Sequence, residues 1–247
     1  NKQLSEDELL RIIKHTCLEK KGKLIIPSFA IGRTQEIVYI LNNFYNEEKL
    51  PRIPIYVDSP LAVNATNIFK LHLDLFNKNV AEVLEYDEDP FGFGTLKYIT
   101  NVNHSKALNA RKEPCIIISA SGMMEAGRVK HHIANNIDNP KNSILAIGYC
   151  APTTLGARIL RGEKEISIHG MPHQVNAEIF SIDAFSGHAD YQEMEQYLRC
   201  QNPEKVKKVF IVHGDYEAQV PYSKVLEKAG FKDIVIPKPG ETFKIES

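Results

Sequence analysis

Residues 114–124 read PCIIISASGMM, an apolar run that ends in a turn of small residues and leads into a helical segment. A short Ile-rich run with a helix after it is typical of a buried strand in a parallel sheet. The same succession of strand and helix recurs along the chain. The expected strands are 23–29, 53–57, 114–119, 143–148, 176–184, 207–212 and 234–236. We therefore predict an α/β fold, with a largely parallel sheet flanked by helices on both faces.

The helices alternate with these strands. Ser5 and Glu8 have the spacing of a capping box, which predicts a helix start at Ser5, and Gly22 predicts its end. The expected helices are 5–21, 35–46, 60–75, 103–110, 124–135, 189–200 and 218–229. Residues 149–175 are expected to be irregular apart from one helical turn at 155–160.

The composition is that of an ordinary globular chain. Of its 247 residues, 43% are hydrophobic and 25% charged, and 30 basic residues against 31 acidic ones give a net charge of −1. These values exclude a disordered chain, a collagen and a basic protein that coats nucleic acid. Because no apolar run approaches about 18 residues, no membrane-spanning helix is expected. The first residues are not a signal peptide, and the missing initiator Met favours a processed chain or a piece of a longer one.

The four cysteines are far apart and form no C-x-x-C pair, so a cysteine-rich structural zinc site is not expected. Cys115 and Cys150 lie in or beside apolar runs, where a free thiol behaves as a small hydrophobe. We predict buried, reduced thiols and a cytoplasmic location.

Candidate binding residues follow the strands, because ligands of open α/β sheets lie outside the carboxyl ends of the strands. The loop at 119–124 has small residues before a helix, which suits an anion such as phosphate or, alternatively, a plain helix cap. Arg33 also begins a helix after a strand and either approaches an anion or is solvated. Asp58 and Ser59 follow another strand, with helix capping as the default role.

Two histidines follow the later strands. His188, in the segment FSGHAD at 185–190, is expected to act as a general acid or base, with Asp190 as a helix cap or orienting group. His213, in VHGD at 212–215, suits a metal ion or acid–base chemistry. If the two strands are neighbours, both imidazoles reach one site, but two histidines do not complete a metal site. The alternative for each is an ordinary surface histidine.

Five motifs, in this order, resemble the β-CASP branch of the metallo-β-lactamase superfamily, which includes RNA nucleases of the cleavage-and-polyadenylation type. The motifs are PSFAIGRTQE at 27–36, VDSPLA at 57–62, SASGM at 119–123, FSGHADY at 185–191 and VHG at 212–214. The resemblance implies a β-CASP domain at 6–175. It also implies that residues 176–247 are the C-terminal βαβαβ segment that closes a metallo-β-lactamase domain.

The resemblance also implies roles for single residues. His188 would be the general acid on the leaving group, and His213 would be a zinc ligand. Arg33 and the loop residues Ser119, Ser121 and Gly122 would line an RNA cleft and touch its phosphates. Two zinc ions in the intact parent would activate a water.

The family's His-x-His-x-Asp-His run does not occur in this sequence. Our hypothesis is therefore the distal part of a zinc-dependent phosphodiesterase, a ribonuclease cleaving single-stranded RNA, with weak or no zinc binding and no activity in this chain alone. The alternatives are a non-catalytic module that binds RNA or protein, and a parent that hydrolyses another substrate. No membrane partner is expected, whereas apolar edges at 176–247 favour a homodimer.

Overall fold

The computed structural model describes residues 2–182 and 189–244. The chain divides into two compact units, Asn1–Ser186 and Gly187–Ser247. The domain boundary expected from the sequence, at 175/176, lies one strand before this division.

The first unit is built on a six-stranded sheet in the order β3-β2-β4-β1-β5-β8, and every neighbouring pair is parallel. The predicted α/β class is therefore confirmed. The strands are β1 Lys23–Pro27, β2 Ile55–Asp58, β3 Leu96–Ile99, β4 Cys115–Ser119, β5 Ser143–Ala146 and β8 Glu178–Ser181.

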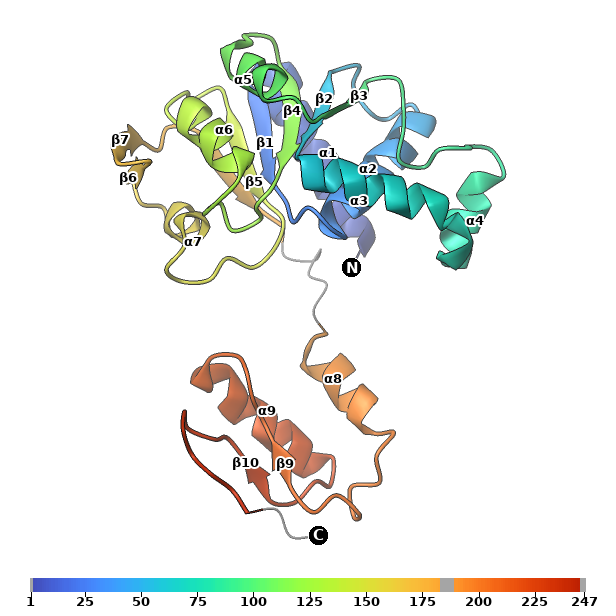
Figure 1. Cartoon of the computed structure of the whole chain (residues 1–247), viewed down its shortest axis with the longest axis vertical. Helices are drawn as coiled ribbons and strands as arrows, with labels where there is room; N and C mark the ends of the chain where they lie inside the picture. The colour runs from blue at the N-terminus through green and yellow to red at the C-terminus, as the bar shows by residue number, and fades with distance from the viewer. Residues whose placement is uncertain (1, 183–188, 245–247) are drawn as a thin grey trace. The chain divides into compact units, whose positions relative to one another are not determined.

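Successive side chains of the central strands enter two separate cores. In β1, Leu24 and Ile26 belong to one apolar cluster, whereas Ile25 belongs to the other. One face of the sheet is covered by α1 and α2 together with α3, and the opposite face by α5, α6 and α7 (Figure 1). The helix bounds in this unit are α1 Lys2–Lys14, α2 Arg33–Asn46, α3 Pro60–Leu71, α4 Lys78–Leu84, α5 Val102–Ala110, α6 Arg128–Asn136 and α7 Leu155–Leu160.

Several expected elements have different bounds. The capping box at Ser5 is wrong, because α1 already includes Lys2 and continues as a π-helix over His15–Glu19. The sixth helix begins at Arg128 rather than at residue 124, and a 3-10 turn at Leu73–Leu75 follows α3. The segment expected to be irregular contains α7 as predicted, and also an antiparallel hairpin of β6 Glu165–Ile168 and β7 Met171–Gln174.

The second unit contains α8 Tyr191–Leu198, β9 Val209–Phe210, α9 Tyr216–Lys228 and β10 Ile234–Val235. Strands β9 and β10 pair in parallel, and Ile211, Leu226 and Phe231 form the core. The sheet pairs place β8 beside β5 and β9 beside β10. The condition under which His188 and His213 would reach one site, β8 and β9 as neighbours, is not met among the pairs of the described strands. In the described part of the chain, no helix is long and apolar enough to cross a membrane.

Candidate functional site

The chain reverses its direction across the sheet between β1 and β4, which are neighbours. The connection after β1 runs into α2 on one face of the sheet, whereas the connection after β4 runs into α6 on the other face. Ligands of parallel α/β sheets bind at such a switch point, outside the carboxyl ends of the strands. The loops at 28–32 and 120–127 therefore have the position expected of a binding site.

Ser119 ends β4 and is buried at this edge. Its hydroxyl donates a hydrogen bond to the carbonyl oxygen of Asp58 over 2.7 Å, and its own carbonyl accepts the backbone N–H of Ser28 over 2.9 Å. The Ser119 side chain thus joins the ends of β4 and β2 and is not available to a ligand in this arrangement. Ser121 donates to the Ala126 carbonyl over 3.3 Å, within its own loop.

Gly122 lies against the ring of Phe29. A Cβ on this glycine would stand 3.0 Å from two ring carbons, so the absence of a side chain is what lets the two loops meet. Phe29 is 47% exposed and Ile31 61% exposed, and Tyr149, which follows β5, is 59% exposed. The loops after β1 and β5 therefore carry exposed aromatic side chains, a residue type on which unpaired nucleic-acid bases stack.

Arg33 lies in the first turn of α2, directly after Gly32, whose φ of 81° favours glycine. The Arg33 guanidinium forms an ion pair with Glu36, and its side chain is only 11% exposed. A phosphate at this position would have to compete with the Glu36 carboxylate. Arg33, the predicted anion-binding residue, thus lies near the switch point, but its guanidinium is already paired with Glu36.

A buried ionic cluster lies around Asp58, at the carboxyl end of β2. The Asp58 carboxylate accepts hydrogen bonds from Arg128 Nη1 at 2.6 Å, from the Ser105 hydroxyl and from His132 Nε2 at 2.6 Å. The side chains of Asp58 and His132 are completely buried. Burial alone would raise the pKa of Asp58, but the hydrogen bonds from His132, Ser105 and Arg128 outweigh it and hold the pKa below its ordinary value.

The same cluster ties together the ends of several elements. Arg128 Nη2 donates to the Thr100 carbonyl over 2.6 Å, and His132 Nδ1 lies 2.8 Å from the side-chain oxygen of Asn109. Asp58 therefore links β2 to α5, α6 and the residues after β3. Sequence reasoning missed this role, and the adjacent pair of histidines at 131–132 was the one available signal.

In the second unit, Asp190 is the N-cap of α8. Its carboxylate accepts the backbone N–H groups of Gln192 and Glu193, and Glu193 in turn accepts the Asp190 N–H, which completes a capping box. His213 follows β9 with a φ of 66°, is exposed, and its carbonyl accepts a hydrogen bond from Gln219. His188 lies outside the described residues, so its predicted nearness to His213 stays a prediction.

Two family comparisons cover most of the chain. Residues 34–159 match the Beta-Casp domain, and residues 172–237 match the Zn-dependent metallo-hydrolase RNA specificity domain. The chain belongs to the β-CASP family. The resemblance inferred from the five motifs is thereby confirmed.

The β-CASP chain is similar to several curated proteins. It is 31% identical to Ribonuclease TTHA0252 of Thermus thermophilus, over 95% of this chain and 52% of that protein. It is 34% identical to the RNase J-like protein of Methanocaldococcus jannaschii, over 90% of this chain and 50% of that protein. It is 30% identical to Transcription termination factor FttA of Methanosarcina mazei, over 87% of this chain and 34% of that protein. The chain thus spans between about a third and a half of the length of these relatives.

The zinc ions of a metallo-hydrolase need more ligands than this β-CASP chain supplies in its described part. Residues 2–182 and 189–244 contain no group of three or more His, Cys, Asp or Glu side chains that could hold a metal ion. His213 is one imidazole, and a zinc site needs three or four protein ligands. The described residues therefore do not fit a complete zinc site.

Three other cations of the β-CASP chain are also paired with carboxylates. Arg158 and Arg161 both form ion pairs with Glu163, at 2.8 and 3.1 Å. Lys208 pairs with Asp233 at 3.0 Å. These basic groups therefore resemble Arg33 and Arg128, each of which has a carboxylate partner.

Proposed function

We propose that the chain is the distal part of a zinc-dependent phosphodiesterase that cleaves single-stranded RNA. In this proposal residues 6–175 are the β-CASP domain and residues 176–247 close a metallo-β-lactamase domain. The match of residues 172–237 to an RNA specificity domain supports RNA as the substrate. Two of the similar proteins are named as ribonucleases, which supports the reaction class.

One observation of the structure carries the RNA part of the proposal. Exposed aromatic side chains follow two neighbouring strands of the parallel sheet, Phe29 after β1 and Tyr149 after β5. Single-stranded RNA offers unstacked bases to such side chains. Arg33 and the backbone of the Ser119–Gly122 loop would then lie along the sugar–phosphate chain.

The chemical step is assigned by the family likeness. His188 would protonate the leaving oxygen, Asp190 would orient the segment at the start of α8, and His213 would contribute one ligand to one of two zinc ions. Because the described residues hold no complete metal site, the remaining ligands would come from a part of the parent outside this chain. Such a chain alone would bind zinc weakly or not at all, and its reduced thiols suit the cytoplasm.

Calorimetric zinc titration of this chain beside its intact parent tests the proposal. We expect tight binding by the parent and weak or no binding by this chain, together with RNA binding by both. Hydrolysis of single-stranded RNA by this chain alone, after chelation and re-metallation controls, would overturn the proposal that the remaining zinc ligands lie in another part of the parent.

A second candidate function is a non-catalytic module that binds RNA. The lack of a metal-binding group in the described part of the chain favours it. The two candidates differ in the gene upstream of Asn1: a segment containing His-x-His-x-Asp-His supports the nuclease, and its absence supports the binding module.

A further inference from the structure

A cavity of about 360 Å³ lies in the first unit between the edge strand β3 and helix α5, and we call it the α5 cavity. Its walls come from β2, β3, α5 and the residue that ends α5. Ile99, Ala107 and Leu108 form the apolar part of these walls. The volume is within the range of small-ligand sites. The basic residues of the walls decide which small ligand fits.

Lys97 reaches the α5 cavity from the sheet. It stands between Leu96 and Tyr98, which pack against the opposite core, and successive side chains of a strand alternate between the two faces. Its register partner in β2 is Tyr56, which belongs to the core on the α5 face. Lys97 is exposed, and in the described part of the chain no carboxylate pairs with it. Its ammonium is therefore available to an anion.

Two further basic side chains come from α5. His104 lies one turn before Leu108 on the same face of the helix, and Arg111 is the C-cap. Arg111 Nη1 donates a hydrogen bond to the Tyr56 hydroxyl over 3.3 Å, and its Nε lies 3.4 Å from a carboxylate oxygen of Glu113. Nη2 forms no hydrogen bond with the described residues. Glu113 is 68% exposed and lies outside the lining, so it is a weak competitor for a ligand.

The C-terminal end of α5 would repel an anion if its carbonyl groups were unpaired, because they carry partial negative charge. The buried ammonium of Lys23 removes this obstacle. Its Nζ donates to the carbonyl oxygens of Leu108 and Asn109, over 3.0 Å in each case. The helix end beside Arg111 is therefore compensated by a positive charge.

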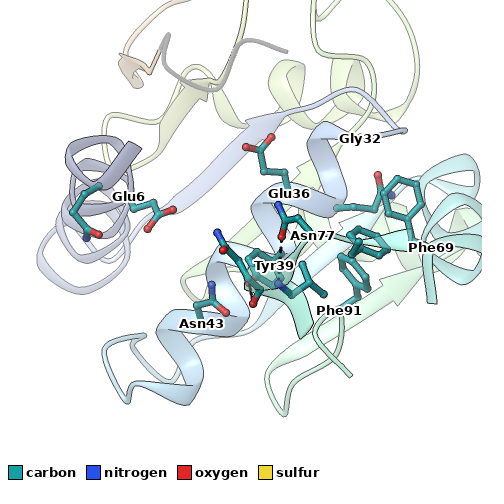
Figure 2. A pocket seen from close by; sticks show the side chains of 13 residues that line it. Glu6, Gly32, Glu36, Tyr39, Asn43, Phe69, Asn77 and Phe91 are labelled. Atoms are coloured by element: carbon teal, nitrogen blue, oxygen red, sulfur yellow. Dashed lines mark hydrogen bonds between the residues drawn. The ribbon is translucent and has the colours of Figure 1, made fainter. Parts of the chain in front are cut away.

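The sign of the charge also distinguishes the α5 cavity from a larger cavity of the same unit. No Asp or Glu is among the described residues that line the α5 cavity. The larger cavity, of about 590 Å³, has Glu6 and Glu36 in its walls, as Figure 2 shows, and no Lys or Arg among its described lining residues. An anion is thus attracted to the first cavity and repelled from the second.

A phosphate monoester matches these basic groups better than a carboxylate does. It carries about 1.5–2 negative charges and three acceptor oxygens, whereas a carboxylate has one charge and two oxygens. The ammonium of Lys97, the guanidinium of Arg111 and the imidazole of His104 can each donate to one of the three oxygens.

We propose that the α5 cavity binds the phosphate group of a small phosphate monoester, whose organic part packs on the apolar walls. The loops at 28–32 and 120–127 do not line this cavity, so the site is additional to the switch point. The proposal does not depend on the RNA-binding function proposed above.

Lysine acetylation of the full chain, read by mass spectrometry, tests the site. Lys97 lines the cavity, whereas Lys106, also exposed and in α5, does not and serves as the internal control. For a Kd on the order of 1 mM, about 10 mM adenosine 5′-monophosphate should slow the acetylation of Lys97 about tenfold and leave Lys106 unchanged. Inorganic phosphate, which lacks an organic part, should need about tenfold higher concentration for the same effect. Sodium acetate at equal ionic strength should protect neither lysine.

His104→Ala, at an exposed position, should raise the nucleotide concentration needed to protect Lys97 about tenfold, the equivalent of one charged hydrogen bond. Arg111→Ala, checked for a native circular dichroism spectrum, should do the same, whereas Lys106→Ala should leave the protection of Lys97 unchanged. Equal slowing at both lysines, or none at Lys97, would overturn the site. Equal protection by acetate would overturn the choice of phosphate, and protection by oligouridylate but not by the mononucleotide would replace the small ligand with an RNA backbone.

Discussion

Replacing Asp58 by Asn should strongly destabilise the first unit. The substitution removes the negative charge that faces His132 and Arg128 at 2.6 Å each, in a place where the Asp58 and His132 side chains have no contact with solvent. Removing one partner of a buried ion pair leaves the other charge uncompensated and costs about 3–5 kcal/mol. With a urea dependence of about 2–3 kcal/mol per molar, the unfolding midpoint should fall by about 1–2.5 M.

Cysteine alkylation in urea, read by mass spectrometry, measures this unit alone. Cys115 is fully buried in β4, and burial raises its pKa to about 11, so the thiol reacts only when the sheet opens. Cys200 is exposed and serves as the internal reference. The matched control is Glu19→Gln, which removes an exposed carboxylate 2.9 Å from His15 and should cost no more than about 1 kcal/mol.

The pH dependence gives the same prediction a second readout. The folded pKa of Asp58 lies below its ordinary value, so its contribution to stability is present above about pH 4 and disappears as the pH falls through the folded pKa. Asp58→Asn should therefore flatten the acid side of the stability curve. The reasoning is refuted if the Cys115 midpoints of Asp58→Asn and Glu19→Gln agree within error.

Four further outcomes are expected. Gly122→Ala should weaken oligouridylate binding about as much as Phe29→Ala, roughly 5- to 150-fold, because its Cβ displaces the Phe29 ring; equal affinities for wild type and Gly122→Ala would contradict this. Hydrogen bonds with Glu19 and, next, with Glu178 raise the pKa of His15, so Glu178→Gln should remove part of a stabilisation that is present below about pH 6.5 and disappears as the pH rises through that raised pKa, measured by thermal melts at pH 5.5 and 8.5. The logarithm of RNA affinity should fall with the logarithm of salt concentration with a slope no steeper than about −1.5, since Arg33 and Arg128 each have a carboxylate partner; a slope of −4 or steeper would show a strong ionic interface. Light scattering should show a dimer that Val212→Lys dissociates, because Val212 is 62% exposed in an apolar groove of about 980 Å³ in the second unit; a monomeric wild type would end the dimer proposal.

The sequence was informative where a local pattern decides the structure. The run at 114–119 has the composition of a strand buried on both faces, and β4 is such a strand, completely buried from Cys115 to Ser119. The predicted helical turn at 155–160 is α7, and the hydroxyl of Thr154 caps it. These features need only neighbouring residues, and so they could be read without the fold.

Local patterns failed where distant residues compete with them. Ser5 has capping-box spacing, yet it is buried inside α1. The β6–β7 hairpin was not predicted, because alternation of apolar and polar residues over only four positions is a weak signal. Its turn, His169-Gly170, has positive φ at both residues. The two residues Asp58 and His132 are 74 positions apart, so no spacing rule could pair them.

The charge arrangement of the first unit indicates where its affinity for RNA would come from. Arg33 and Arg128 each have a carboxylate partner, so a phosphate gains little from either guanidinium unless it displaces that partner. The exposed rings of Phe29 and Tyr149 carry no such competitor. Stacking contributes about 1–3 kcal/mol per base and needs bases that are free of a complementary strand. The net charge of the chain is −1, so stacking on its aromatic side chains would contribute more than attraction to phosphates. Such binding would select single strands, because only their bases are unstacked, and not the phosphate charge that all nucleic acids share.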